Sequence, residues 1–412
     1  MAFSYHKKTV LISEASKLPF WRHPIALLIL MAMAMPVAFS SWSALLNNFV
    51  IEVADFDGVA IGWLHGVREI PGFLAVGVIF VLYILREQPL AVISLIALGA
   101  ATAVTAWFPS FSGLLVTTLI GSLGFHYYET VNQSLQLQWL DKKTAPGTLG
   151  IIVAVGSAAS LVAYVGIVLG WRYWGLTYEY AYLISGGVTV LLALVAWFWF
   201  PRFETDTPQI RKMILRKRYW LYYALNFMAG ARRQIFLVFA AFMMVERFGF
   251  EVHELTALFI LNYIANMIFA PLMGGLVMRI GERNALVFEY GGLIIVFALY
   301  GGIYIFDWGA TLAMALYVVD HLFFALAFAL KTYFQKIADP KEIAPTAAVV
   351  FTINHIPAVF LPVALGYLWI FSPGAVFVIA ALMAVASLAL ALQIPRHPVA
   401  GNETIWSKHK AA

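Results

Sequence analysis

The stretch PRFETDTPQIRKMILRKR, residues 201–218, is the one long polar segment in the interior of this sequence, and it divides the chain. Six apolar runs precede it and six follow it. Each run is long enough for an α-helix to cross the ~30 Å hydrocarbon core of a bilayer. The runs cover residues 24–49, 59–84, 89–107, 112–138, 147–170, 178–200, 219–245, 255–279, 284–305, 309–331, 345–369 and 373–394.

Composition also indicates a membrane protein. Of the 412 residues, 62% are hydrophobic and 11% are charged, whereas about 25% are charged in a typical soluble domain. We therefore expect an all-α membrane protein with twelve transmembrane helices. The expected parts are an N-terminal six-helix bundle (residues 1–200), a cytoplasmic linker (201–218) and a C-terminal six-helix bundle with a short cytoplasmic tail (219–412).

The lysine and arginine residues predict the orientation. With the N-terminus inside, 21 of the 26 fall in cytoplasmic segments, Arg172 and Arg247 fall outside, and Arg68, Arg232 and Arg233 lie within spans. The positive-inside rule then places both termini in the cytoplasm. The polar N-terminal segment has no apolar stretch followed by a cleavage site, so we interpret it as a tail. We expect a multi-pass protein of a bacterial inner (plasma) membrane, whose net charge of +5 needs no nucleic-acid partner.

A weak internal repeat relates the two halves of the chain. HYYETVNQSLQLQWLDKKTAP in the first half matches HLFFALAFALKTYFQKIADPKEIAP in the second, which pairs His126 with His321. Parallel six-helix repeats are a known plan of transporters. In addition, the segment GGLVMRIGER between the eighth and ninth runs resembles the signature loop of the major facilitator superfamily. Gly274, Leu276, Arg279, Gly281 and Arg283 fall on its positions, whereas Met278 replaces the usual aspartate.

This resemblance implies two pseudo-symmetric six-helix bundles around a central cavity, with Gly274, Arg279, Gly281 and Arg283 in a gating loop. In this superfamily the first, second, fourth and fifth helices of each half line the cavity, and the third and sixth face lipid. The deep charges and histidines of this chain lie in five expected cavity helices. Spans three and twelve have no charged residue or histidine, span six has only Glu179 at its start, and span nine has only Glu289.

Ionisable groups inside a membrane mark a functional pathway by default. We therefore expect substrate binding or coupling by charged and polar residues of these cavity helices. They are His65, Arg68, Glu69, His126, Glu129, Tyr222, Asn226, Arg232, Arg233, Asp320, His321, Asn354 and His355.

The adjacent arginines of the seventh span are predicted to have different roles. Arg233 shares a helical face with Tyr222 and Asn226, whereas Arg232 points about 100° away. We expect Arg233 to contact substrate and Arg232 to pair with a carboxylate from a neighbouring helix.

Structural roles remain open as alternatives for these groups. Arg68 with Glu129, or Arg232 with Asp320, could be charge pairs that hold helices together, because buried ions are normally paired. His355 could be a packing residue or a proton carrier.

The sequence argues against an enzyme. It contains no GxxxxGK[ST] nucleotide loop and no nucleophile elbow, and no cytoplasmic segment is long enough for a catalytic domain. We expect a monomeric secondary transporter that moves a small polar, anionic or zwitterionic solute by alternating access, with lipid and protons as its other partners. Guanidinium groups suit carboxylate or phosphate recognition. Histidine and the buried carboxylates Glu69, Glu129 and Asp320 suit proton exchange, although sodium coupling stays open.

Two other transport classes remain as alternatives. A copper-like transporter would use the histidines with Met31, Met33 and Met35, since imidazole and thioether groups suit copper, but methionine is also an ordinary apolar filler. A drug–proton antiporter is disfavoured because the fifth span, GTLGIIVAVGSAASLVAYVGIVLGW, lacks the Gly-Pro pair usual in that subgroup. The chain has no cysteine, so thiolate metal sites are excluded, and we expect no cofactor and no bound metal.

Overall fold

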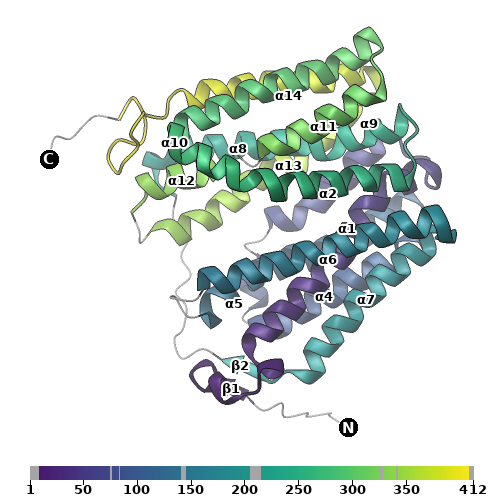
Figure 1. Ribbon diagram of the computed structural model, residues 1–412, viewed down its shortest axis with the longest axis vertical. Coiled ribbons are helices and arrows are strands. Elements are labelled where there is room, and N and C mark those ends of the chain that lie inside the picture. Colours follow the sequence, from purple (N-terminus) through teal and green to yellow (C-terminus); the bar gives the residue numbers. More distant parts are fainter. Residues whose placement is uncertain are drawn as a thin grey trace. The chain divides into compact units, whose positions relative to one another are not determined.

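The computed structural model describes residues 9–74, 77–82, 84–140, 145–204, 215–324, 326, 328–339 and 342–407. Residues 205–214 of the predicted linker and the two ends of the chain lie outside the described residues. Contacts divide the chain into two compact units (Figure 1). The first unit is Met1–Phe49 with Leu74–Ile210, and the second is Val50–Phe73 with Arg211–Ala412.

The first unit is built mainly from helices. Its elements are β1 Thr9–Leu11, η1 Ile12–Lys17, η2 Phe20–Arg22, α1 Pro24–Glu52 (up to Phe49), α3 Val78–Val81, α4 Glu87–Val104, η4 Thr105–Trp107, α5 Phe111–Trp139, α6 Ala145–Trp174, α7 Tyr178–Trp199 and β2 Arg202–Glu204. Helix α4 packs against both α5 and α7. Leu28 of α1, Leu95 of α4 and Tyr128 of α5 are buried together in its core.

Two short strands lie in segments that we interpreted as tail and linker. β1 and β2 pair in parallel, with Thr9 opposite Arg202 (Figure 1). The Gln88 side chain fixes β2, because its Nε2 donates to the Pro201 carbonyl at 2.8 Å and its Oε1 accepts from the Phe203 amide at 2.8 Å. The first residues of the linker are therefore attached to α4.

The second unit contains the remaining helices. They are α2 Gly58–Phe73, η5 Lys217–Tyr219, α8 Trp220–Ile235, the π-helix η6 Phe236–Ala240, α9 Ala241–Glu246, α10 Val252–Phe306, α11 Ala310–Phe324, α12 Phe328–Ile337, α13 Ile343–Phe371 and α14 Pro373–Ala391. Helix α2 belongs to this unit because it packs along α13. The contact-based division thus differs from chain order by residues 50–73, and the boundaries of the two six-helix bundles stay a prediction.

Each of the twelve predicted apolar runs overlaps helix in the described residues. Within those residues, nine helices are long and apolar enough to span a membrane, and Ala310–Phe323 is a shorter apolar helix. The eighth and ninth runs form one long helix, α10, with a sharp kink at Gly281 (φ 80°, ψ 162°). Because side chains rarely adopt this backbone conformation, glycine is needed at that position.

The contact between α2 and α13 depends on the absence of a side chain at Gly62. A Cβ there would clash with the Pro362 carbonyl oxygen. We expect Gly62→Ala to destabilise the protein, since overpacking costs about 1–3 kcal/mol and the better helix propensity of alanine returns only about 1 kcal/mol. The measurement is the melting temperature in detergent.

Gly291→Ala in α10 is the matched control, because a Cβ at Gly291 meets nothing within 4 Å. Its melting temperature should equal or exceed that of the wild type. A Gly62→Ala variant as stable as Gly291→Ala would contradict the close packing of α2 on α13.

A group of charges outside the predicted spans attaches the start of α8 to the start of α13. Glu342 accepts from Arg216 Nε at 2.7 Å, from Arg218 Nη2 at 2.6 Å and from the Tyr219 hydroxyl at 2.8 Å. The same hydroxyl accepts from the Asp339 amide at 3.1 Å. The hydrogen bonds from Arg218 first, then from Tyr219 and Arg216, lower the pKa of Glu342 to about 2.

This lowered pKa predicts a pH dependence of stability. The contribution of Glu342 is fully present above the ordinary glutamate pKa of about 4.3, and it is lost as the pH falls through the folded-state pKa of about 2. Wild type should therefore melt above Glu342→Gln at neutral pH, and the difference should shrink in acid. Melting curves of both proteins across pH test this, with the exposed Glu14→Gln as control. A difference that grows in acid would contradict the assignment.

Candidate functional site

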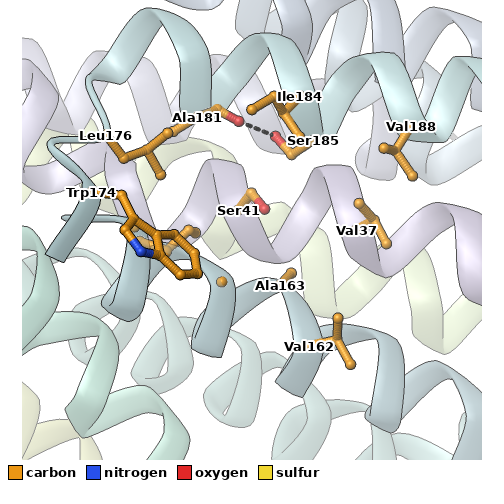
Figure 2. Close-up of a pocket in the computed structure, with 13 residues that line it drawn as sticks. Val37, Ser41, Val162, Ala163, Trp174, Leu176, Ala181, Ile184, Ser185 and Val188 are labelled. Atoms are coloured by element: carbon orange, nitrogen blue, oxygen red, sulfur yellow. Dashed lines mark hydrogen bonds between the residues drawn. The ribbon is translucent and has the colours of Figure 1, made fainter. Parts of the chain in front are cut away.

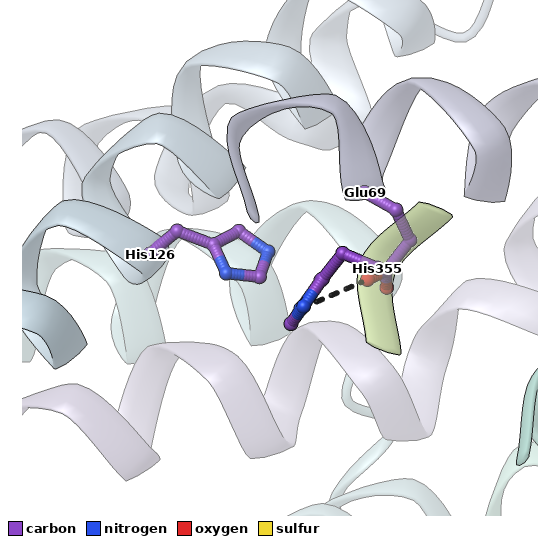
Figure 3. Close-up of side chains that lie close together, drawn as sticks. All are labelled: Glu69, His126 and His355. Carbon is purple, nitrogen blue, oxygen red and sulfur yellow. Dashed lines mark ion pairs between the residues drawn. The ribbon is translucent and has the colours of Figure 1, made fainter. Parts of the chain in front are cut away.

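Three helices of the second unit bring together four of the predicted site residues, which we call the binding cluster: Arg68, Glu69, Arg233 and His355. Arg68 and Glu69 lie on α2, Arg233 on α8 and His355 on α13. Glu69 Oε1 accepts from Arg68 Nη2 at 2.6 Å and from Arg68 Nε at 3.0 Å. Glu69 Oε2 lies 3.6 Å from His355 Nε2, and Figure 3 shows the carboxylate and the imidazole facing each other.

The hydrogen bond on the other side of His355 fixes its tautomer. His355 Nδ1 lies 2.7 Å from the Phe351 carbonyl oxygen, and because a carbonyl only accepts, Nδ1 must carry a proton. In a neutral His355 the lone pair of Nε2 would face the negatively charged oxygen of Glu69, and the two would repel each other. One additional proton between His355 and Glu69 removes this repulsion.

Among the described residues, Arg233 is the guanidinium group of the cluster that forms no hydrogen bond to a carboxylate. It interacts electrostatically with Glu69 and Arg68, but in the described part of the chain it forms no ion pair, and its buried Nε has no hydrogen-bond partner. Glu69 is already engaged by Arg68. The cluster thus has two guanidinium groups and one carboxylate, an excess of positive charge before any proton is added.

His65 lies on the same helix as Arg68 and Glu69 and is buried. It interacts electrostatically with both. The i, i+3, i+4 spacing of these three residues therefore places His65 next to the binding cluster, as expected for one helical face.

The polar residues predicted to share a face with Arg233 contact neighbouring helices. The ring of Tyr222 stacks on Phe334 of α12 at 4.2 Å between centroids. Asn226 Nδ2 donates to the Tyr222 carbonyl at 2.7 Å, and Asn354 Nδ2 of α13 donates to the Asn226 carbonyl at 3.0 Å. The ring stacking joins α8 to α12 and the Asn354 hydrogen bond joins α8 to α13, whereas the Asn226 side-chain bond lies within α8. A contact with substrate stays a prediction for all three residues.

Arg232 forms the expected pair with a carboxylate from another helix, but the partner is Glu289 of α10. Arg232 Nη2 lies 2.9 Å from Glu289 Oε1, and the two side chains are 4% and 1% exposed. The suggested Arg232–Asp320 pair is therefore wrong as a direct ion pair, although Asp320 is buried and interacts electrostatically with both residues. Neighbouring His321 is half-buried, with its ring 6.4 Å from that of Phe236.

Sequence reasoning missed Glu289 because span nine was expected to face lipid. The signal was present, since a carboxylate in an apolar span needs a partner.

The remaining predicted residues of the first unit lie on α5. His126 is buried with its ring edge against Phe125, at 5.0 Å between centroids. Glu129 is half-buried and forms no ion pair among the described residues. The suggested pairing of Glu129 with Arg68 stays a prediction, while Arg68 is engaged by Glu69 within the second unit.

The first unit also contains a cavity that involves none of the predicted residues. It measures about 310 Å³ and lies between α1, α6 and α7 (Figure 2). Its lining is mostly apolar, with Trp174 at one end, and the Ser185 hydroxyl donates to the Ala181 carbonyl at 2.9 Å.

The predicted gating residues lie around the kink of α10. Gly274 and Arg279 precede Gly281 and Arg283 follows the kink. The ion pair at this place is made by a residue that we did not predict, because buried Glu282 lies 2.6 Å from Lys336 Nζ of α12. Glu282 thus attaches the kink of α10 to helix α12.

Comparison with known proteins identifies the family. The family model of the Major Facilitator Superfamily matches residues 27–362. The chain belongs to the Major Facilitator Superfamily. No curated protein matches the sequence. The predicted family and the all-α membrane fold are confirmed, and membership in the Major Facilitator Superfamily makes the protein a multi-pass secondary transporter of a small molecule.

Solved structures of other members share the fold. A single-residue mutant of the nucleoside transporter NupG has a TM-score of 0.73 and 16% identity, and the match covers 90% of this chain and 99% of that one. A bacterial homologue of the human lysosomal transporter Spinster, inward-facing and occupied, has a TM-score of 0.67 and 15% identity, with 89% and 95% covered. At sequence identities of 15–16%, the similarity to these structures shows a shared fold.

Proposed function

We propose that this transporter moves a small polar solute with a negative group, an anion or a zwitterion, by alternating access. The supporting observation is the excess of positive charge in the binding cluster. Glu69 offsets one of the two guanidinium groups, and Arg233 is left for a ligand. A planar guanidinium group can donate two parallel hydrogen bonds to a carboxylate or phosphate. A zwitterion carries the same negative group and fits Arg233 in the same way.

We also propose that the transport is coupled to protons through the Glu69–His355 pair. The proton between these two residues raises the charge of the cluster from +1 to +2, which favours an anion. The bound proton then raises the affinity for the anion, and the bound anion raises the affinity for the proton by the same factor. Such positive coupling corresponds to movement of both in the same direction.

The topology remains part of the proposal. Both termini and the linker lie in the cytoplasm of a bacterial inner membrane, and the transporter works as a monomer. Reporter fusions that place residues 201–218 outside would overturn this orientation.

The experiment that tests the proposed substrate class is a thermal-shift screen of the purified protein. A ligand that binds the folded state and not the unfolded state stabilises the protein by about 2.7 kcal/mol when its concentration is 100 times its Kd. The arms are organic acids, phosphorylated metabolites, amino acids, uncharged nucleosides and copper or zinc salts. We expect stabilisation by a negatively charged or zwitterionic compound. Stabilisation by nucleosides alone, or by a metal alone, would overturn the proposal.

The copper-like alternative has little support from the methionines. Met31 has no exposed surface and is packed in the core of the first unit with Leu27 and Leu28, and Met35 packs against the same core. This arrangement favours a packing role, which is the ordinary one for methionine.

A further inference from the structure

The second unit contains another group of charges, formed by Arg232 of α8, Glu289 of α10 and Asp320 of α11, which we call the buried triad. Arg232 and Glu289 form one pair at 2.9 Å. Asp320 has 1% of its surface exposed and interacts electrostatically with both. Each partner still has a buried atom without a hydrogen bond: Arg232 Nη1, Glu289 Oε2 and Asp320 Oδ1.

The triad has two acidic groups and one cation, so its charge is −1 if both carboxylates are ionised. An uncompensated charge is very unfavourable inside a protein or a bilayer, and a buried acid commonly becomes neutral by taking up a proton. Glu289 is bonded to Arg232, which stabilises its ionised form. Asp320 lacks such a bond among the described residues. The nearby Tyr300 hydroxyl does not supply one, because it donates to the Ala313 carbonyl at 3.3 Å.

We propose that Asp320 holds a proton at neutral pH beside the Arg232–Glu289 pair, so that the buried triad is a protonation site distinct from the binding cluster. The adjacent arginines of α8 explain how two sites arise on one helix, because consecutive residues point about 100° apart. Arg233 is directed to the charges of α2, whereas Arg232 is directed to α10. This inference does not depend on the identity of the solute.

Other titratable groups near Asp320 determine how it can be measured. They are Arg232 on α8, Glu289, Tyr290 and Tyr300 on α10, and Tyr317 and His321 on α11 itself. Because the histidine and the tyrosines also titrate, the measurement must be a difference between wild type and an Asp320 variant.

Infrared spectroscopy of the full-length protein in detergent at neutral pH gives that difference. We expect wild type to show a C=O stretching band of a protonated carboxyl group that shifts in D₂O and is missing in Asp320→Asn. Asp339→Asn, outside the predicted spans, is the control and should keep the band. Asp320→Thr serves if the first variant does not fold. Loss of the band in Glu289→Gln but not in the Asp320 variants would overturn the assignment, as would its absence from wild type.

A second measurement separates a proton from a sodium ion. Asn resembles the protonated form of Asp320, so the two proteins should melt alike below the ordinary aspartate pKa of about 3.9. As the pH rises from there to neutral, wild type should lose stability relative to Asp320→Asn, because the unfolded chain releases the proton that the folded protein keeps. The melting temperature of neither protein should depend on sodium at constant ionic strength. Parallel melting curves between acid and neutral pH, or stabilisation of wild type alone by sodium, would overturn the inference.

Discussion

Arg233→Lys is expected to weaken binding of the negatively charged solute by roughly 10- to 150-fold, which corresponds to the ~1.5–3 kcal/mol of one charged hydrogen bond. Lysine keeps the charge but loses the planar donor pair. Arg233 forms no ion pair within the described residues, so the fold should stay intact. The measurement is the Kd of the compound identified by thermal shift, together with the melting temperature of the unliganded variant.

Arg232→Lys is the matched control for Arg233→Lys. It has the same change of chemistry at the adjacent position, but Arg232 is engaged by Glu289. Its effect on binding should be much smaller. If Arg232→Lys loses binding and Arg233→Lys does not, the assignment of the two helical faces is wrong. If both bind like wild type, the arginines are structural and the proposed anion loses its main support.

Arg232→Ala is expected to lower the free energy of unfolding by ~3–5 kcal/mol, because it leaves Glu289 as a buried carboxylate without its cation. Both side chains of the pair are almost fully buried. Unfolding by denaturant in detergent measures the change.

The double variant Arg232→Met, Glu289→Leu is the control for the buried pair. Replacing both charges by apolar groups of similar size is often neutral or stabilising, so the double variant should be more stable than Arg232→Ala. A double variant as unstable as Arg232→Ala would show that the loss comes from packing rather than from an unpaired charge.

The fold class could be predicted because its causes are local in the sequence. Apolar runs, the polar stretch 201–218 and the distribution of lysine and arginine each depend on the bilayer rather than on tertiary contacts. The break between the eighth and ninth runs was also visible, since the loop motif ends in Gly281 and Arg283, and the chain kinks at Gly281.

The partners within the site could be predicted only by type. Helical spacing gives the face on which Arg232 lies, but not which helix packs on that face, so the expected carboxylate was found on α10 instead of α11. The Arg68–Glu69 pair was missed because spacing rules compare residues three or four apart. Adjacent side chains as long as these can still meet beyond the helix surface.

The association of α2 with α13 had a sequence signal that we did not use. Gly58, Gly62 and Gly66 follow one another at intervals of four, the pattern of small residues that lets membrane helices approach closely.

This row of glycines on α2 has a mechanical consequence. Each glycine of the row faces a group of α13 at close range: Gly58 faces the Trp369 side chain, Gly62 the Pro362 carbonyl and Gly66 the Val359 carbonyl. A shift of α2 would bring residues with a Cβ into these places, so the two helices should move as one rigid body. The register between α8 and α13 is fixed as well, by the Asn354–Asn226 hydrogen bond. The Glu69–His355 contact joins α2 to α13 and should therefore persist through any motion of this pair of helices.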